Sequence, residues 1–335
     1  NPRNRVVNPS MAISQENGFG TQVVPTTGNF YLTDQINTSI ASSSNGALQS
    51  SYQALEGERA IRITATTATT DLSANIIAGK LQLNLEKSNM HQLDGGNVVI
   101  AFKCRTNWAG KLSLSLQRGG GGRTYVTDVD VVAGINQVFK VIPFESDTVG
   151  SQAAENGRGL EVFIGYNNEG AQQQSAANND AWQTGFFGCS DASTQWTKTI
   201  NNYVEITNVD LYAGNVPREF QPNSYAYDRA ECQSYFYRQY GNTLGVGTVF
   251  TTNVGFFVIT LPVTMRVAPA TSISSLGAIT VFQNGSAIGG LSSFTQGSNS
   301  PSSVGIQISA TLTAAQPFLA RLGLVTDYID HNARL

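Results

Sequence analysis

Histidine and carboxylate side chains are the groups best suited to move protons in an enzyme, and this sequence offers few of them. Its two histidines are His91, in the polar stretch EKSNMHQLDGG, and His331, near the end of the chain. Both positions are typical of surface residues. No G-x-S-x-G motif accompanies them, so a Ser-His-Asp system is not indicated.

Two carboxylates, Asp128 and Asp130, lie two residues apart on a predicted strand and would share one of its faces. Such a pair could hydrolyse a glycosidic bond. Acidic residues on the solvent side of an amphipathic strand also follow from the alternation itself, so the pair is weak evidence for catalysis. The sequence predicts that the chain is not an enzyme.

A stretch rich in amide side chains, YNNEGAQQQSAANNDAW (166–182), follows a well-patterned strand, and TQWTKT comes shortly after it. Amide donors and acceptors beside an aromatic ring suit a neutral sugar, because its hydroxyls need hydrogen bonds and its C–H face needs a flat apolar surface. The predicted carbohydrate-binding residues are Tyr166, Asn167, Asn168, Trp182 and Trp196. In the alternative interpretation the tryptophans belong to the core and the amides only solvate a loop.

Motifs for phosphate and metal binding are missing. RGGGGR (118–123) lacks the Lys-Ser/Thr of a phosphate loop and falls between two predicted strands, so we expect a hairpin connection. Cys104, Cys189 and Cys232 show no C-x-x-C spacing, and we expect buried free thiols. Loop oxygens could hold a structural Ca²⁺, but no EF-hand-like spacing occurs, and we predict no cofactor or metal.

The composition excludes some partners. Charged residues are 13% of 335, the formal net charge is −3, and no Lys/Arg block occurs, so nucleic acid is not an expected partner. No apolar run approaches the roughly 18 residues that span a bilayer, and NPRNRVVNPS lacks the apolar core of a secretory signal. We therefore expect a chain that does not insert into a membrane.

Short segments with apolar residues at every second position fill the first two-thirds of the chain. Segments 98–104, 112–116, 125–131 and 160–166 show this period most clearly. The alternation predicts strands with one buried face, arranged as a β-sandwich over residues 1–220. In YVEITNVDLYAG the apolar phase shifts between Ile206 and Val209, which predicts a β-bulge near Thr207 and Asn208.

Residues 221–242 read as a helix between two domains, because GNVPREFQP ends the preceding strand with two prolines. Asn223 or Ser224 is a plausible N-cap, Asp228 lies in the first turns, and Gly241 and Asn242 stop the helix. We predict one apolar stripe that packs on another domain or subunit. It comprises Tyr225, Arg229, Cys232, Phe236 and Tyr240.

Residues 243–335 return to strand patterns and predict a second, smaller β domain. Asn284-Gly285 between short apolar flanks is the strongest hairpin signal in the chain. VGFFVITLPV is apolar on both faces, which in so small a domain favours contact with another subunit. No repeat of 20 to 50 residues is visible.

Several of these segments together resemble bacteriophage tail and fibre proteins. RVVNPSMAISQENG (5–18) resembles their opening strand, and VEITNVDLYAGNVPREFQP looks like the last strand of their carbohydrate-binding-module-like jelly roll. ECQSYFYRQYG is similar to the helix that follows, while PVTMRVAPATSIS (262–274) and DYIDHNARL resemble distal segments. The chain departs from the pattern at Pro9, at Tyr212-Ala213 and at Arg334.

The resemblance implies an all-β virion fibre or spike component with an N-terminal jelly-roll β-sandwich, a short linking helix and a smaller C-terminal β-sandwich that often forms a trimer. We expect it to lie on a virion with other virion proteins and to bind a bacterial surface polysaccharide without cleaving it. A purely structural capsid decoration or fibre protein and a polysaccharide depolymerase remain as alternatives.

Overall fold

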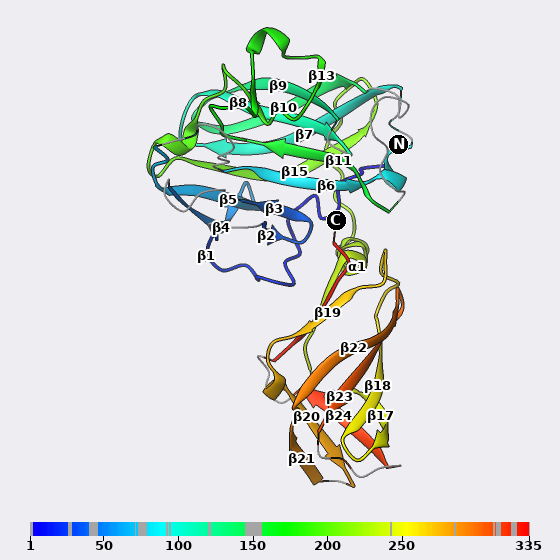
Figure 1. Ribbon diagram of the computed structural model, residues 1–335. Coiled ribbons are helices and arrows are strands. Elements are labelled where there is room, and N and C mark those ends of the chain that lie inside the picture. Colours follow the sequence, from blue (N-terminus) through cyan, green and yellow to red (C-terminus); the bar gives the residue numbers. More distant parts are fainter. Residues whose placement is uncertain are drawn as a thin grey trace. The chain divides into compact units, whose positions relative to one another are not determined.

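The computed structural model describes residues 3–334 except 26–28, 40–45, 71, 73–78, 92, 94, 120–121, 145–155, 242, 285, 311, 313–315 and 323–326. The chain divides into two compact units, Asn1–Asp228 and Arg229–Arg334. Strands dominate both units (Figure 1). The protein is all-β, as its alternating pattern predicts. In the described part, no helix is long and apolar enough to cross a bilayer.

Two large antiparallel sheets form most of the N-terminal unit, and a small parallel sheet of two strands adds to them. The six-stranded sheet has the order β1 (Gln22–Val23), β4 (Ala47–Leu55), β5 (Glu58–Thr67), β15 (Tyr203–Ala213), β7 (Asn97–Thr106), β10 (Gly134–Pro143). The seven-stranded sheet has the order β13 (Trp182–Thr184), β9 (Arg123–Val131), β8 (Gly110–Arg118), β11 (Arg158–Ile164), β6 (Leu81–Glu86), β3 (Ile36–Thr38), β2 (Phe30–Thr33). The chain crosses repeatedly between the sheets, as in a jelly-roll β-sandwich.

The core between these sheets is built from the predicted alternating positions. Val98, Ile100, Phe102 and Cys104 of β7 are fully buried in it, as are Leu112, Leu114 and Leu116 of β8. Cys104, Cys189 and Cys232 are buried free thiols, as expected. The RGGGGR connection joins the antiparallel strands β8 and β9, although its residues 120 and 121 lie outside the described part.

The opposite face of the seven-stranded sheet is also buried, which the sequence pattern does not reveal. Ser113, Ser115 and Gln117 of β8 point away from the core, yet they are at most 7% exposed. The segment that follows β11 lies over this face: the Ser113 hydroxyl donates to the Tyr166 carbonyl (3.0 Å). This segment contains short elements: β12 (Gln173–Gln174), η2 (Ala176–Asn178), β14 (Cys189–Ser190) and η3 (Trp196–Lys198). The remaining short helix of this unit is η1 (Lys87–Asn89).

The predicted bulge in β15 is confirmed. The pairing of β15 with β7 shifts between Thr207 and Asp210, and Asn208 has a φ of +55°. A bulge bends the strand and re-aims side chains. Asn tolerates the left-handed region better than most residues do.

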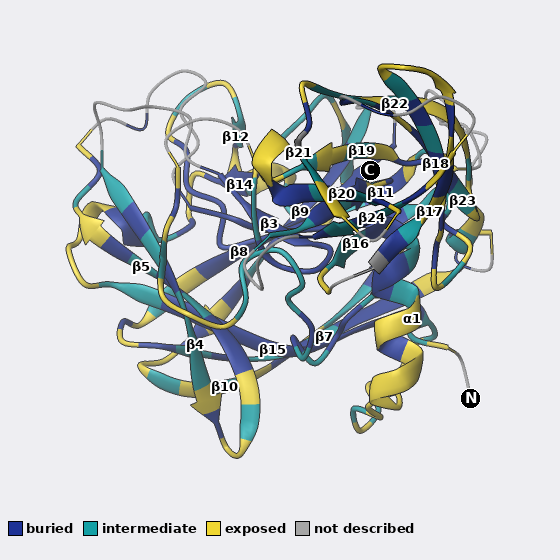
Figure 2. Ribbon diagram, turned by 90° about the horizontal axis from the view of Figure 1, so that it is seen from below, coloured by how far each residue is buried: buried dark blue, intermediate teal, exposed yellow. Residues whose placement is uncertain are grey.

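The helix α1 (Tyr225–Tyr235) is shorter than the sequence suggests, and the division between the two units falls inside it. Its first turns are exposed in Figure 2. Phe236 begins β16 (Phe236–Gln239), which pairs with β25 (Ile329–Asn332). The expected stripe of five side chains is therefore wrong for Phe236 and Tyr240, which lie beyond the helix. Aromatic residues favour strands, and the backbone of this aromatic stretch pairs with β25, which lies far along the chain.

The C-terminal unit is a smaller sandwich. Its three-stranded sheet has the order β16, β25, β19 (Ala270–Ile273). Its seven-stranded sheet has the order β21 (Ser286–Gly290), β20 (Ile279–Gln283), β24 (Pro317–Leu322), β17 (Thr243–Thr251), β18 (Val254–Thr260), β23 (Ser303–Ser309), β22 (Ser293–Ser300). A short helix, η4 (Leu276–Ala278), precedes β20. The predicted hairpin at Asn284 joins β20 to β21, and Gly285 itself lies outside the described part.

Candidate functional site

The residues predicted to bind a sugar are mostly interior. Tyr166, Asn167 and Asn168 are 0% exposed and Trp196 is 2% exposed. Their polar groups serve the fold: Trp196 Nε1 and Asn167 Nδ2 both donate to the Gly165 carbonyl, at 2.9 and 2.7 Å, and Asn168 Oδ1 accepts from the Gly170 N–H. Side chains buried in this way have no surface for an external ligand, so the prediction does not hold for these four residues.

Trp182, the fifth predicted residue, is half-buried on the edge strand β13. Its Nε1 donates to the Pro143 carbonyl (2.7 Å), and its ring meets Phe144 edge-on at 5.6 Å. It packs against the main core. The alternative interpretation, in which the tryptophans are packing residues, fits both Trp182 and Trp196.

The two aspartates of β9 have different partners. Asp128 accepts hydrogen bonds from Ser190 Oγ (2.5 Å), Ser193 Oγ (2.6 Å) and Asn179 Nδ2 (2.8 Å), which fasten the covering segment to the sheet. Asp130 is exposed and pairs with Lys111 (3.1 Å). A carboxylate that accepts three hydrogen bonds from the covering segment is a structural anchor.

The two histidines differ. His91 is exposed, as expected. The surface expectation is wrong for His331, which is 0% exposed, because β25 carries it into the C-terminal unit between β16 and β19. Its ring stacks on Tyr237 (5.9 Å) and its Nδ1 lies 3.0 Å from Thr271 Oγ1. Burial lowers the pKa of His331 to about 4.

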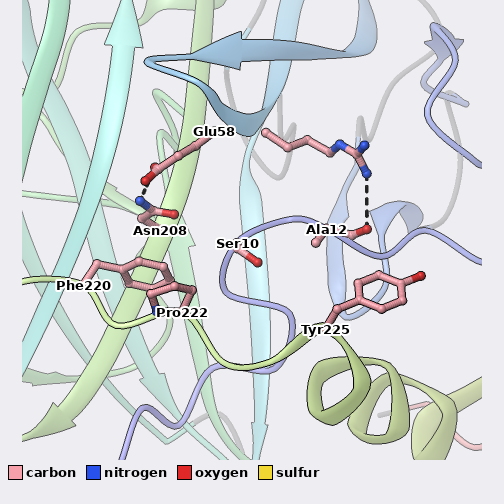
Figure 3. Close-up of a pocket in the computed structure, with 8 residues that line it drawn as sticks. Ser10, Ala12, Glu58, Asn208, Phe220, Pro222 and Tyr225 are labelled. Carbon is pink, nitrogen blue, oxygen red and sulfur yellow. Dashed lines mark hydrogen bonds between the residues drawn. The ribbon is translucent and has the colours of Figure 1, made fainter.

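The candidate site is a groove on the N-terminal unit, made of two neighbouring hollows that share Glu58 and Arg59. Their volumes are about 420 and 410 Å³. We call it the Arg59 groove. The first hollow is lined by Ser10, Ala12, Glu58, Arg59, Asn208, Phe220, Pro222 and Tyr225 (Figure 3), and the second by Phe19, Tyr52, Gln53, Ala54, Gly57, Glu58 and Arg59.

A tight hairpin places the two shared residues. Glu56 and Gly57 connect β4 to β5 with φ values of +51° and +84°, and Leu55 pairs with Glu58. Two successive left-handed residues are typical of a type I′ turn, whose twist matches that of the strands. The turn therefore presents Glu58 and Arg59 at the start of β5, where both line the groove.

The β15 bulge supplies the amide of the groove. Asn208 Nδ2 donates to Glu58 Oε2, as the dashed line in Figure 3 shows. Lys103 Nζ lies 3.7 Å from the same oxygen and 2.8 Å from Glu56 Oε2. Its hydrogen bond to Glu56 raises the pKa of Lys103. Since both described contacts of Glu58 use Oε2, Oε1 is left to accept a bond from a ligand.

Arg59 is held without using most of its donors. Its guanidinium carbon lies 3.8 Å from the centroid of the Phe19 ring, and Nη1 donates to the Ala12 carbonyl (3.2 Å). The Thr207 hydroxyl donates to the Arg59 carbonyl (2.6 Å). An arginine has five N–H donors. In the described part of the chain, one of them is used, so the others face the groove and solvent.

The N-terminal segment forms one wall because Asn8 ties it into a turn. Asn8 is fully buried with a φ of +56°; its Nδ2 donates to the Ile13 carbonyl (2.8 Å) and its Oδ1 accepts from the Ile13 N–H (3.1 Å). Ser10 and Ala12 lie between these residues. Further along, Phe19 meets Tyr52 edge-on at 4.7 Å.

The exit segment after β15 forms another wall. Arg218 fixes it with a bidentate ion pair to Asp210 (2.8 and 2.9 Å) and lies over the Tyr212 ring at 4.0 Å. Phe220, Pro222 and Tyr225 then line the first hollow. Of the groove aromatics, Tyr225 is 60% exposed and Phe19 is 42% exposed, so both offer ring surface to a ligand.

The groups of the groove can hydrogen-bond to a ligand and pack against it. A carboxylate, an amide and a guanidinium are planar groups that can bond to adjacent hydroxyls, and the exposed rings can cover an apolar ring face. Among the described residues no group of three or more His, Cys, Asp or Glu could hold a metal ion. The sequence pointed to one part of the groove, the β15 bulge, but neither to the turn at Glu56 and Gly57 nor to the meeting of the two.

Comparisons with known proteins give a weak structural likeness. No protein-family model matches the chain, and no curated protein matches it. A solved carbohydrate-binding module, CBM4, is 12% identical with a TM-score of 0.30 and covers 60% of this chain and 100% of its own. A family 11 module from Clostridium thermocellum, in complex with a β-1,3-1,4-mixed-linked tetrasaccharide, is 8% identical with a TM-score of 0.29 and covers 60% and 100%.

A third solved structure is the enzymatically active domain of tailspike protein 4 from bacteriophage CBA120. It is 10% identical with a TM-score of 0.30, and the match covers 63% of this chain and 21% of that one. TM-scores near 0.3 are too low to carry a conclusion from any of these proteins to this chain.

Proposed function

We propose that the chain binds a polysaccharide in the Arg59 groove and does not cleave it. The single observation that carries the proposal is the placement of Glu58, Arg59 and Asn208 beside the exposed rings of Phe19 and Tyr225. Each polar group holds at least one partner that fixes its position, while Glu58 Oε1 and most Arg59 donors stay unused. Such preorganised groups lose little entropy when a ligand binds.

The two hollows argue for an extended ligand. Because Glu58 and Arg59 line both, a chain of at least two sugar rings can contact the same pair from both sides. Shallow contacts of this kind are weak singly, and linked copies raise avidity by about 10² to 10⁴. The proposal therefore includes a homo-oligomer, which we expect to be a trimer.

The biological setting that fits best is a fibre or spike on a phage or phage-like particle, attached to other virion proteins and recognising a bacterial surface polysaccharide. The support is the sequence resemblance in the opening segment, at the end of β15 and in the distal segments. A low charge content of 13% is compatible with recognition of hydroxyl-rich ligands.

A glycan array of bacterial surface polysaccharides, probed with the purified chain, tests the proposal. Binding that is lost in Arg59→Ala supports it. Silence across the array overturns it in favour of a purely structural capsid or fibre protein. Incubation with the same polysaccharides tests the depolymerase alternative: chains that are shortened by the wild type but not by Asp128→Ala or Asp130→Ala would contradict a non-catalytic role.

A further inference from the structure

A small hollow opens on the seven-stranded sheet of the C-terminal unit, where strands β20, β24 and β17 lie side by side. We call it the Arg321 hollow. The residues that line it include Val246, Phe282, Asn284, Pro317, Leu319 and Arg321. Its volume is about 320 Å³, near the lower end of the range of about 300–1,000 Å³ for small-molecule sites. This size favours a small ring compound over a segment of another protein.

The strand register places an arginine and an aromatic ring together in the hollow. In β24, Leu319 and Arg321 alternate with buried residues and therefore point away from the core of the unit. Leu319 pairs with Phe282 of β20 and with Val246 of β17. The guanidinium carbon of Arg321 lies 5.4 Å from the centroid of the Phe282 ring. A cation and a ring thus stand side by side among apolar side chains.

The guanidinium of Arg321 has no anion to pair with. Among the described residues it makes neither a hydrogen bond nor an ion pair. Arg321 is also the only charged residue in the seven strands of this sheet. Arg238 of the other sheet differs, because Asp330 accepts two hydrogen bonds from it, each 2.7 Å long. The planar fork of Arg321 is therefore available to a ligand, and the group that fits such a fork is a carboxylate.

The charge of the C-terminal unit favours an anionic ligand as well. Arg229–Arg334 contains five arginines, no lysine and three side-chain carboxylates, although the whole chain has a formal net charge of −3. Apolar walls around the Arg321 guanidinium reduce competition from water, which strengthens a hydrogen bond to a charged group.

Two further groups suit a sugar ring that carries the carboxylate. Asn284, at the turn between β20 and β21, is exposed and has a φ of +52°. Its amide can donate to and accept from hydroxyl groups. The half-buried ring of Phe282 and the side chain of Leu319 offer apolar surface to the C–H face of a sugar.

We propose that the Arg321 hollow binds an acidic sugar residue of a polysaccharide, with the sugar carboxylate on the Arg321 guanidinium. A uronic acid has both parts that the hollow accommodates, a planar carboxylate and a ring with an apolar face. A neutral sugar leaves the guanidinium without an anion, and the carboxylate of a protein side chain brings no ring. The inference rests on the proposed function for the polysaccharide, and it adds a second site with a different class of ligand.

Isothermal titration of the full chain tests the inference with a galacturonic acid disaccharide and the neutral galactose disaccharide of the same linkage. The background is Arg59→Ala, in which the Arg59 groove does not compete. The acidic disaccharide should bind at least about tenfold more tightly than the neutral one. Arg321→Gln in this background should abolish the preference, because an amide offers a carboxylate no charge.

Arg229→Gln is the matched control, since it removes an exposed arginine of the same unit and changes the net charge equally. It should keep the preference. Asn284→Asp retains Arg321 and adds a negative charge at the rim, at a positive φ that Asp tolerates. It should weaken binding of the acidic disaccharide several-fold. Circular dichroism checks that each variant is folded.

Equal affinity for the two disaccharides, or no binding of the acidic one, overturns the inference. A preference that survives in Arg321→Gln, or is lost equally in Arg229→Gln, overturns it too. Binding of galacturonic acid itself without binding of its disaccharide would assign the hollow to a free acid and not to a polysaccharide.

Failure of the Arg59 groove gives a different result. Neutral polysaccharide that binds the wild type and Arg59→Ala equally would contradict the groove and leave the acidic preference of the Arg321 hollow intact.

Discussion

The guanidinium carbon of Arg59 lies 3.8 Å from the centroid of the Phe19 ring. This contact joins the β4–β5 hairpin to the N-terminal segment and places a cation and an exposed aromatic ring side by side. A cation over a ring is worth about 0.5–1 kcal/mol at an exposed site. The pair is therefore a modest structural contact whose remaining donors and ring surface are free for a ligand.

Removing the guanidinium should weaken polysaccharide binding more than it weakens the fold. We expect Arg59→Ala to reduce affinity by about tenfold or more, because both hollows lose their shared donor. Isothermal titration with a polysaccharide fragment measures this. Lys111→Ala, which removes an exposed cation paired with Asp130, is the control, and an equal loss of affinity there would contradict a specific role for Arg59.

The bulge residue allows backbone and side-chain effects to be separated. Asn208→Ala should cost about 1–2 kcal/mol of unfolding free energy, because a non-glycine residue without a polar side chain is strained at positive φ and the bond to Glu58 is lost. Asn208→Gly relieves the strain but still removes the amide. Urea denaturation should therefore give Asn208→Gly a higher unfolding free energy than Asn208→Ala. Both variants should bind polysaccharide more weakly than the wild type.

Glycan binding that survives unchanged in Asn208→Gly would show that the amide does not contact the ligand. The bulge would then serve only the shape of β15.

The two aspartates of β9 should differ in their effect on the covering segment. Asp128→Asn replaces an acceptor of three hydrogen bonds with a group that cannot accept them all, and it should destabilise the segment 174–193 by about 1–3 kcal/mol. Asp130→Asn should change stability by less than about 0.5 kcal/mol. Hydrogen exchange of the segment is the readout, and equal protection in the two variants would be evidence against the anchor.

His331 should make the C-terminal unit sensitive to acid. Burial lowers its pKa from 6.5 to about 4, so between these values the unfolded chain binds the proton and the folded chain does not. Stability is therefore unaffected above about pH 6.5 and falls as the pH decreases toward 4, by at most about 3 kcal/mol. Asp330, the neighbouring charge, acts in the opposite direction and is the weaker influence.

Thermal unfolding of wild type, His331→Gln and the exposed control His91→Gln across this pH range measures the effect. The variant His331→Gln should lose part of the acid sensitivity, and His91→Gln should keep it. Parallel pH profiles for all three proteins would contradict the assignment.

Alternation in the sequence was sufficient to predict the strands and the core they form, since Leu112, Leu114 and Leu116 point inward as their spacing requires. The bulge was equally visible, because one extra residue shifts the apolar phase. The end of α1 was not, since Phe236 gains its strand partner from β25, almost a hundred residues away in the chain.

The site was harder to predict than the fold. The polar residues after β11 look like a solvent-exposed loop in the sequence, yet Asn167 and Asn168 are fully buried. They are buried because this segment covers the outer face of the seven-stranded sheet. The polar side chains at alternate positions of β8 suggest that this face is exposed to solvent. The Arg59 groove combines four segments that are far apart in sequence. Phe19 belongs to no motif, and Tyr225 was expected only as part of the helix stripe. Only the fold brings both to the same groove.

A structure of the full chain with fragments of a bacterial surface polysaccharide tests the central claim most directly. We predict density for at least two sugar rings between Phe19, Arg59 and Asn208, with one ring against an exposed aromatic side chain. Crystals of Phe19→Ala should lose this density, and those of Phe139→Ala, which removes a 52% exposed ring on β10, should keep it. Sugar bound elsewhere on the protein, with the Arg59 groove empty, would contradict the account.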